Sequence, residues 1–171
     1  MENSGYLQND PESIRYRRNS NTLTILGAGV SIFGFWGIIK LFTQIALGIH
    51  IFDASDEEAL GDIGMIIAMF FLVIIMAFDV LLRLFVGLRA RRDGQGKKVG
   101  KSYLVFIVWL MIGSIGSIYI VIDSILQGSG AFFDNYVALF MELSSLGICL
   151  EVFIAAISVR RYRAKMKKES N

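Results

Sequence analysis

Residues 63–88 read IGMIIAMFFLVIIMAFDVLLRLFVGL, a run of 26 residues in which Asp79 and Arg83 are the charged side chains. A helix needs about 20 mostly apolar residues to cross the ~30 Å hydrocarbon core of a bilayer. A strand of a membrane β-barrel would instead alternate polar and apolar residues, and this run does not. The stretch therefore predicts a transmembrane helix.

Three further apolar segments accompany this one. The 171-residue chain is 54% hydrophobic and 19% charged, with a mean hydropathy of +0.57, whereas a soluble domain is typically about 45–50% apolar and 25% charged. Because the connections between the segments are short, we predict an all-α integral membrane protein, a four-helix up-down bundle. Its predicted spans are 22–47, 63–88, 103–126 and 136–159.

The basic residues predict the orientation of these spans. Of the 17 Lys and Arg residues, 15 lie in a tail over 1–21, in the second connection, or in a basic tail over 160–171. The first connection is acidic. Basic segments remain on the cytoplasmic side of a membrane, so we expect both termini in the cytoplasm and a multi-pass protein of a plasma membrane of bacterial type. The basic segments would then contact anionic lipid headgroups.

Several kinds of chemistry find no support in the sequence. Cys149 is the single cysteine and His50 the single histidine, so neither a disulfide pair nor a pair of axial histidines for haem is available. The positive-inside pattern already accounts for the basic clusters, which argues against a nucleic-acid surface. We predict no cofactor, no metal site and no catalytic residues.

Ionisable residues inside the spans are the candidates for function. Each costs roughly 2.5–3.5 kcal/mol to insert, so each is a functional candidate by default. Counting along the spans places three in the outer part and three in the inner part of the bilayer. The outer three are Lys40, Asp123 and Glu142, and the inner three are Asp79, Arg83 and Glu151.

The two glutamates of the last span cannot both face the interior of a simple four-helix bundle. Glu142 and Glu151 are nine residues apart, and nine steps of about 100° place them on opposite faces of one helix. A simple bundle buries one stripe of each helix. We therefore expect a second copy or another membrane subunit along the fourth helix. The alternative is that Glu142 reaches the outer interface.

A weak internal echo relates the second and fourth spans. Asp79-Val80 and Glu151-Val152 each precede a basic cluster by nine or ten residues, which predicts similar depths for the two acids. Arg83 lies four residues after Asp79, the spacing of an ion pair on one helix face. We hypothesise that Arg83 bridges Asp79 and Glu151.

Small residues mark predicted helix contacts, because they allow backbones in lipid to approach closely. The candidates for helix packing are Gly27, Ser31, Gly34, Gly113 and Ser117.

These observations favour a non-enzymatic subunit or assembly factor of a larger membrane complex. The alternative is a small oligomeric proton- or cation-coupled transporter or channel. Asp79 and Glu151 would carry its ions, Arg83 would tune them, and Glu142 would mark the outer entry. A membrane enzyme that uses the same carboxylates on lipid is the third hypothesis.

Overall fold

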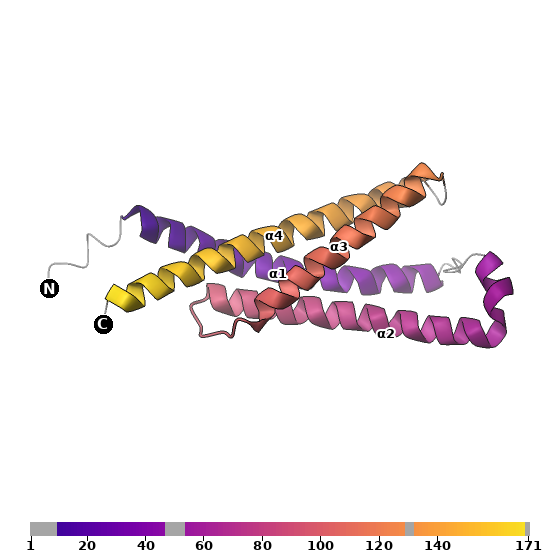
Figure 1. Ribbon diagram of the computed structural model, residues 1–171, viewed down its shortest axis with the longest axis horizontal. Helices are drawn as coiled ribbons and strands as arrows, with labels where there is room; N and C mark the ends of the chain where they lie inside the picture. Colours follow the sequence, from indigo (N-terminus) through magenta and orange to yellow (C-terminus); the bar gives the residue numbers. More distant parts are fainter. Residues whose placement is uncertain (1–9, 47–53, 129–131, 170–171) are drawn as a thin grey trace.

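The computed structural model describes residues 10–46, 54–128 and 132–169, and the secondary structure elements in these residues are helices (Figure 1). The helices are α1 (Pro11–Ala46), α2 (Ala54–Gly94), α3 (Ser102–Leu126) and α4 (Phe132–Glu169). Each of the four contains a stretch long and apolar enough to cross a membrane. The prediction of an all-helical chain with four such helices is confirmed.

The helices extend beyond the predicted spans. Residues 11–21, expected as part of a tail, form the first turns of α1, and α4 continues past residue 159 to Glu169. Pro11 suits the first position of a helix because its fixed φ is already helical and its missing N–H needs no partner. The polar ends are rich in Arg and Lys, which are good helix formers, so nothing in the sequence ends these helices at a membrane boundary.

A bend divides α2 near its start. Gly61 has φ 62° and ψ 176°, a left-handed conformation that glycine adopts at little cost. The first turns of α2 therefore lie at an angle to the long apolar part that follows (Figure 1).

Two pairs of consecutive helices, α1–α2 and α3–α4, are joined through α1 and α4. α1 packs along α2, and α4 packs to a similar extent against α3 and against α1, whereas α2 makes few contacts with α3 and α4. The α1–α2 pair and the α3–α4 pair separate toward the end of the molecule where α3 ends and α4 begins (Figure 1). The hydrophobic core lies where the pairs meet, around Leu23, Val86, Ile107 and Val152.

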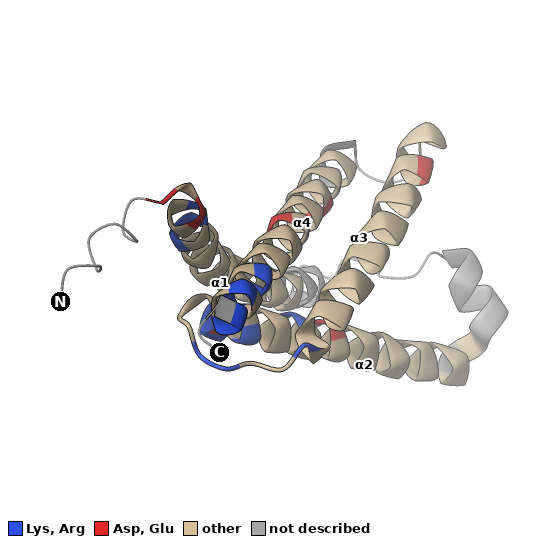
Figure 2. Ribbon diagram, turned by 60° about the vertical axis from the view of Figure 1, so that its left-hand side comes forward, with Lys and Arg blue, Asp and Glu red and all other residues tan. Residues whose placement is uncertain are grey.

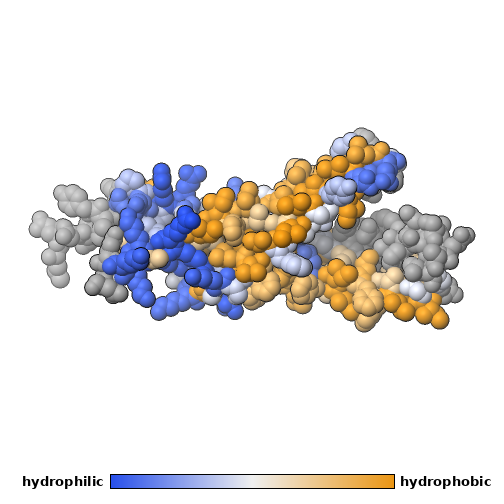
Figure 3. All heavy atoms as spheres, in the orientation of Figure 1, coloured by the Kyte–Doolittle hydropathy of each residue, from blue (hydrophilic) through white to orange (hydrophobic). Residues whose placement is uncertain are grey.

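Charge is concentrated at the end of the molecule where α1 begins and α4 ends. The Lys and Arg residues of 11–18, 89–101 and 160–168 lie there, and we call this the basic end (Figure 2). The surface beyond it is largely hydrophobic in the view of Figure 3. Large side chains such as Phe70, Ile120 and Phe140 are exposed on it. Beyond the basic end, the molecule is thus apolar on its surface as well as in its core.

Glycines bring α1 and α2 into backbone contact. A Cβ atom on Gly27 would lie 2.8 Å from the carbonyl oxygen of Gly87, and one on Gly87 would overlap Ser31 Oγ and the carbonyl oxygen of Gly27. A Cβ on Gly34 would lie 3.2 Å from Arg83 Cβ. The predicted packing residues of the first span therefore lie in the α1–α2 contact.

The third span behaves differently. A Cβ atom on Gly113 would meet nothing within 4 Å, so this residue does not lie at a contact between the described helices. Ser117, one turn further along α3, lines a cavity that is described below.

We predict that Gly87→Ala destabilises the protein by about 1–3 kcal/mol, because the added methyl group has no space between α1 and α2. Thermal unfolding in detergent measures the effect. Gly113→Ala is the matched control, since its methyl group enters open space and alanine favours a helix. Equal unfolding midpoints for the two variants would contradict the backbone contact.

Candidate functional site

A cavity of about 380 Å³ lies in the fork between the two helix pairs. All four helices line it. Its walls combine aromatic and sulfur-containing side chains with charged and hydroxyl groups, as a binding site for a small ligand commonly does. The polar lining residues are Asp79, Arg83, Ser117, Glu142 and Ser145, and Phe33, Trp36, Met76 and Met141 are among the apolar ones.

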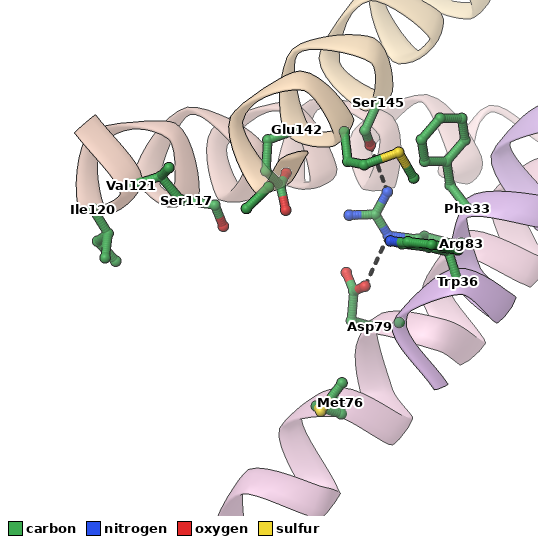
Figure 4. Close-up of a pocket in the computed structure, with 13 residues that line it drawn as sticks. Phe33, Trp36, Met76, Asp79, Arg83, Ser117, Ile120, Val121, Glu142 and Ser145 are labelled. Atoms are coloured by element: carbon green, nitrogen blue, oxygen red, sulfur yellow. Dashed lines mark hydrogen bonds and ion pairs between the residues drawn. The ribbon is translucent and has the colours of Figure 1, made fainter. Parts of the chain in front are cut away.

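Arg83 is at the centre of the polar residues. Its Nε donates to Asp79 Oδ2 over 2.8 Å, and its Nη1 donates to Ser145 Oγ over 2.6 Å (Figure 4). The Arg83 side chain is 11% exposed and that of Asp79 is 47% exposed. Arg83 therefore links α2 to α4, while the carboxylate of Asp79 stays open to the cavity.

Glu142 brings a second carboxylate to this site. It lies three residues before Ser145 on α4 and extends toward the cavity (Figure 4). With every group ionised, two carboxylates face one guanidinium, which gives the lining a formal charge of −1. The cavity favours a cation or a hydrogen-bond donor over an anion.

The remaining predicted charges do not join this site. Asp123 is exposed near the end of α3 and accepts a hydrogen bond of 2.7 Å from Gln127 Nε2. Glu151 is exposed on α4. The side chain of Lys40 lies outside the described residues. The structure thus unites Asp79, Arg83 and Glu142, which the depth count had placed in two separate layers.

The predicted bridge from Arg83 to Glu151 is wrong. Arg83 is level with Ser145 on α4, and Glu151 lies six residues further along, or about 9 Å along the helix axis. α2 and α4 run in the same direction, because Arg83 bonds to Ser145, while Asp93, further along α2, bonds to Arg163, further along α4. Asp79 is therefore level with Glu142 rather than with Glu151, and the echo does not place its two acids at one depth.

A second polar cluster, which the sequence analysis missed, closes the basic end. Asp93 is 1% exposed at the end of α2. Its carboxylate accepts hydrogen bonds from Tyr103 Oη at 2.6 Å, Arg160 Nε at 2.9 Å and Arg163 Nη1 at 2.7 Å. Arg160 also donates to the carbonyl oxygen of Val99, at 3.1 Å. We call Asp93, Tyr103, Arg160 and Arg163 the Asp93 cluster.

The same cluster reaches α1. Arg163 Nε donates to Tyr16 Oη at 3.2 Å, and the rings of Tyr16 and Tyr162 stack with centroids 4.7 Å apart. Ser20 Oγ donates to the carbonyl oxygen of Gly94. One buried carboxylate and its immediate neighbours therefore join all four helices at the basic end.

Part of this arrangement has a signal in the sequence. Asp93 is the single acid among the six cations of residues 89–101, and Tyr103 follows ten residues later. An isolated acid in a basic segment suggests an ion pair, but its partners Arg160 and Arg163 are more than sixty residues away. Which of the fifteen cations pair with it depends on the packing of α4 against α2.

In the part of the chain that the structure describes, no group of three or more His, Cys, Asp or Glu side chains could hold a metal ion. Comparison of the chain with protein-family models, with curated proteins and with solved structures finds no match. Function must therefore be inferred from the site itself.

We predict that Asp93→Asn destabilises the protein by about 3 kcal/mol, because it leaves two guanidinium groups without their shared charge partner. Cys149 reports on the change, since it is the single cysteine and is buried in the core between the helix pairs. Its alkylation by a small thiol reagent should become faster as the pairs separate.

Glu12→Gln provides the control for this measurement. Glu12 pairs with Lys165 at 2.6 Å, and both side chains are half exposed, so the loss of this pair costs about 0–1 kcal/mol. An Asp93→Asn protein that labels no faster than Glu12→Gln would show that the Asp93 cluster does not hold the helices together.

Proposed function

We propose that this protein is an integral membrane protein with both termini in the cytoplasm and four spans that cross the bilayer alternately up and down. The basic end then faces the cytoplasmic leaflet of a plasma membrane, in accord with the positive-inside rule. Exposed side chains such as Phe70, Ile120 and Phe140 support this placement. Contact of these apolar side chains with acyl chains is favourable, whereas their contact with water is unfavourable.

We further propose that it acts as a non-enzymatic subunit or assembly factor of a larger membrane complex. Glu151 carries this proposal. Its side chain is exposed on α4, and it lies nine residues from Arg160 at the basic end, or about 14 Å along the helix axis. A carboxylate facing lipid at this depth costs roughly 2.5–3.5 kcal/mol. A partner helix that donates a hydrogen bond or a cation to Glu151 removes this cost.

The surroundings of Glu151 suit a helix. Exposed residues recur at intervals of three or four along α4, and a Cβ atom on Gly147, one turn before Glu151, would meet nothing within 4 Å. A partner backbone therefore has space to approach beside the carboxylate. We call this surface the α4 face; it consists of Phe140, Leu143, Gly147, Leu150, Glu151 and Ile154.

A different subunit suits the α4 face better than a second copy of this chain. Apart from Lys40, the single cation within the predicted spans is Arg83. Arg83 is 11% exposed and already bonded to Asp79 and Ser145, so a second copy cannot bring it to Glu151. The expected partner is a transmembrane helix that contains its own basic residue or hydrogen-bond donor.

We predict that affinity purification in a mild detergent recovers a stoichiometric membrane partner, and that Glu151→Leu lowers its recovery about tenfold, as expected for one polar contact between helices in lipid. A photo-crosslinker at Leu150 should join the same partner. Because Leu150 is exposed on the α4 face, the crosslink locates the contact as well as detecting it.

Asp123→Leu and a crosslinker at Phe70 are the matched controls. Asp123 is also an exposed acid within the apolar part of the chain, and Phe70 is an exposed residue on α2. Neither residue belongs to the α4 face. Recovery that falls equally for Asp123→Leu, or a crosslink that forms equally from Phe70, would contradict a partner at Glu151.

A proton- or cation-coupled transporter is the second candidate, and the fork cavity favours it. The cavity contains two carboxylates and one guanidinium, and packed core residues and the Asp93 cluster close the molecule at the basic end. A cavity closed toward one end of the molecule is expected in one state of an alternating-access cycle. In this case Glu142 and Asp79, rather than Glu151, would bind the ion.

Flux through proteoliposomes that contain the purified chain alone distinguishes the two candidates. A subunit without its complex should show no uptake of protons or monovalent cations above empty liposomes. Uptake that Glu142→Gln lowers more than about tenfold and Glu151→Gln leaves unchanged would establish the transporter and overturn the subunit. The tenfold limit separates loss of an ion-binding group from a small change in reconstitution.

A further inference from the structure

A second concave site lies at the basic end, between the first turns of α1 and the last turns of α4. It has a volume of about 210 Å³, and Arg15, Tyr16, Ser158, Arg161 and Lys165 are among the residues that line it. We call it the α1–α4 pocket. It is separate from the fork cavity, since the two share no lining residue.

Two contacts fix the walls of this pocket. Tyr16 of α1 stacks on Tyr162 of α4, with ring centroids 4.7 Å apart. One turn of helix away from each ring, Asn19 Nδ2 donates to Ser158 Oγ at 2.7 Å. Because Arg15 and Arg161 directly precede the stacked tyrosines, the same contacts set the positions from which both guanidinium groups extend.

The pocket has cations that the protein itself does not use. Arg160 and Arg163 are bonded to Asp93, and Lys165 is paired with Glu12 at the rim. Arg15 and Arg161 are exposed, and neither has a hydrogen bond or ion pair with any residue that the structure describes. Three cations and one carboxylate line the pocket, so its formal charge is +2.

A hydroxyl group completes the set of donors. Ser158 Oγ accepts the hydrogen bond from Asn19, so its own proton is available for a ligand. Two guanidinium groups and one hydroxyl are the groups that bind a phosphate, because each guanidinium can donate two parallel hydrogen bonds to its oxygens.

We propose that the α1–α4 pocket binds the phosphate headgroup of an anionic membrane lipid. Arg15 and Arg161 contact the phosphate oxygens and Ser158 donates a hydrogen bond. The proposal rests on the membrane placement given above, but it is independent of any partner at Glu151 and of any ion in the fork cavity.

The position of the pocket favours a lipid over a soluble phosphate. Ile154 lies one turn from Ser158, on the side away from the basic end, and is 58% exposed. An acyl chain that continues from a headgroup in the pocket can therefore lie along the apolar surface of α4. Tyr16 and Tyr162 also line the pocket, and tyrosines are common at the headgroup level of membrane proteins.

The test uses the full-length chain, purified and delipidated in a neutral detergent, and measures its thermal unfolding as lipid is added. Phosphatidylglycerol should raise the unfolding midpoint and phosphatidylcholine should not, since a ligand of the folded state stabilises it by mass action. The double variant Arg15→Gln, Arg161→Gln should need about tenfold more phosphatidylglycerol for half the rise. Its midpoint in phosphatidylcholine should equal that of the original protein, which shows that it folds.

Lys97→Gln, Lys98→Gln is the matched control. It removes two exposed cations from the same end of the molecule but outside the pocket, and it should change the half-saturating lipid concentration by less than about threefold. An equal loss in this control, or no rise with phosphatidylglycerol, would overturn the pocket. A rise of the same size with millimolar inorganic phosphate would overturn the lipid as its ligand.

The outcome is separate from that of the subunit proposal. The lipid titration contains no other protein, so its result does not depend on whether a partner is recovered by affinity purification. Conversely, a negative titration does not test the partner contact at Glu151. If Arg15→Gln, Arg161→Gln unfolds early in phosphatidylcholine, then Arg15→Lys, Arg161→Lys replaces it. That variant keeps both charges but loses the paired donors, so it should bind between the original protein and the glutamine variant.

Discussion

The carboxylate of Asp93 is the constraint on which the arrangement of the four helices depends. It lies at the end of α2, accepts hydrogen bonds from α3 and α4, and is joined to α1 through Arg163 and Tyr16. A buried charge is stabilised only when its partners are held in place. The requirement therefore brings the ends of all four helices together at the basic end, and nothing comparable unites them at the other end in the part of the chain that the structure describes.

The fork follows from how unevenly the helices can approach one another. Gly27 and Gly87 let α1 and α2 meet backbone to backbone, so this pair stays together along its length. On α3, by contrast, a Cβ atom on Gly113 or Gly116 would meet nothing within 4 Å. α2 and α3 consequently have few contacts. The pairs separate, and Arg83 with Asp79 and Ser145 is the polar contact that spans the gap.

The sequence was sufficient to predict the four apolar helices, because a run of more than twenty apolar residues has few other structures available to it. It also identified Asp79, Arg83 and Glu142 as charges that need partners. It could not show that these three meet, since hydropathy indicates depth only coarsely and says nothing of the relative shift of α2 and α4. Asp93 was missed because hydropathy also locates helix ends only coarsely. It lies among six cations and was therefore assigned to a connection, whereas α2 continues to Gly94.

The two polar clusters use the same chemical groups in opposite proportions. In the Asp93 cluster two guanidinium groups share one carboxylate, whereas in the fork cavity one guanidinium faces two carboxylates. The basic end therefore has a surplus of positive charge and the cavity a surplus of negative charge, at full ionisation. Because the field of a charged site favours a ligand of opposite sign, the basic end favours anions, and the fork favours cations or hydrogen-bond donors. Asp93 contributes to both ligand preferences through helix packing. The packing that buries its carboxylate also places Arg83 beside Ser145. The same packing leaves Arg161 in the lining of the α1–α4 pocket.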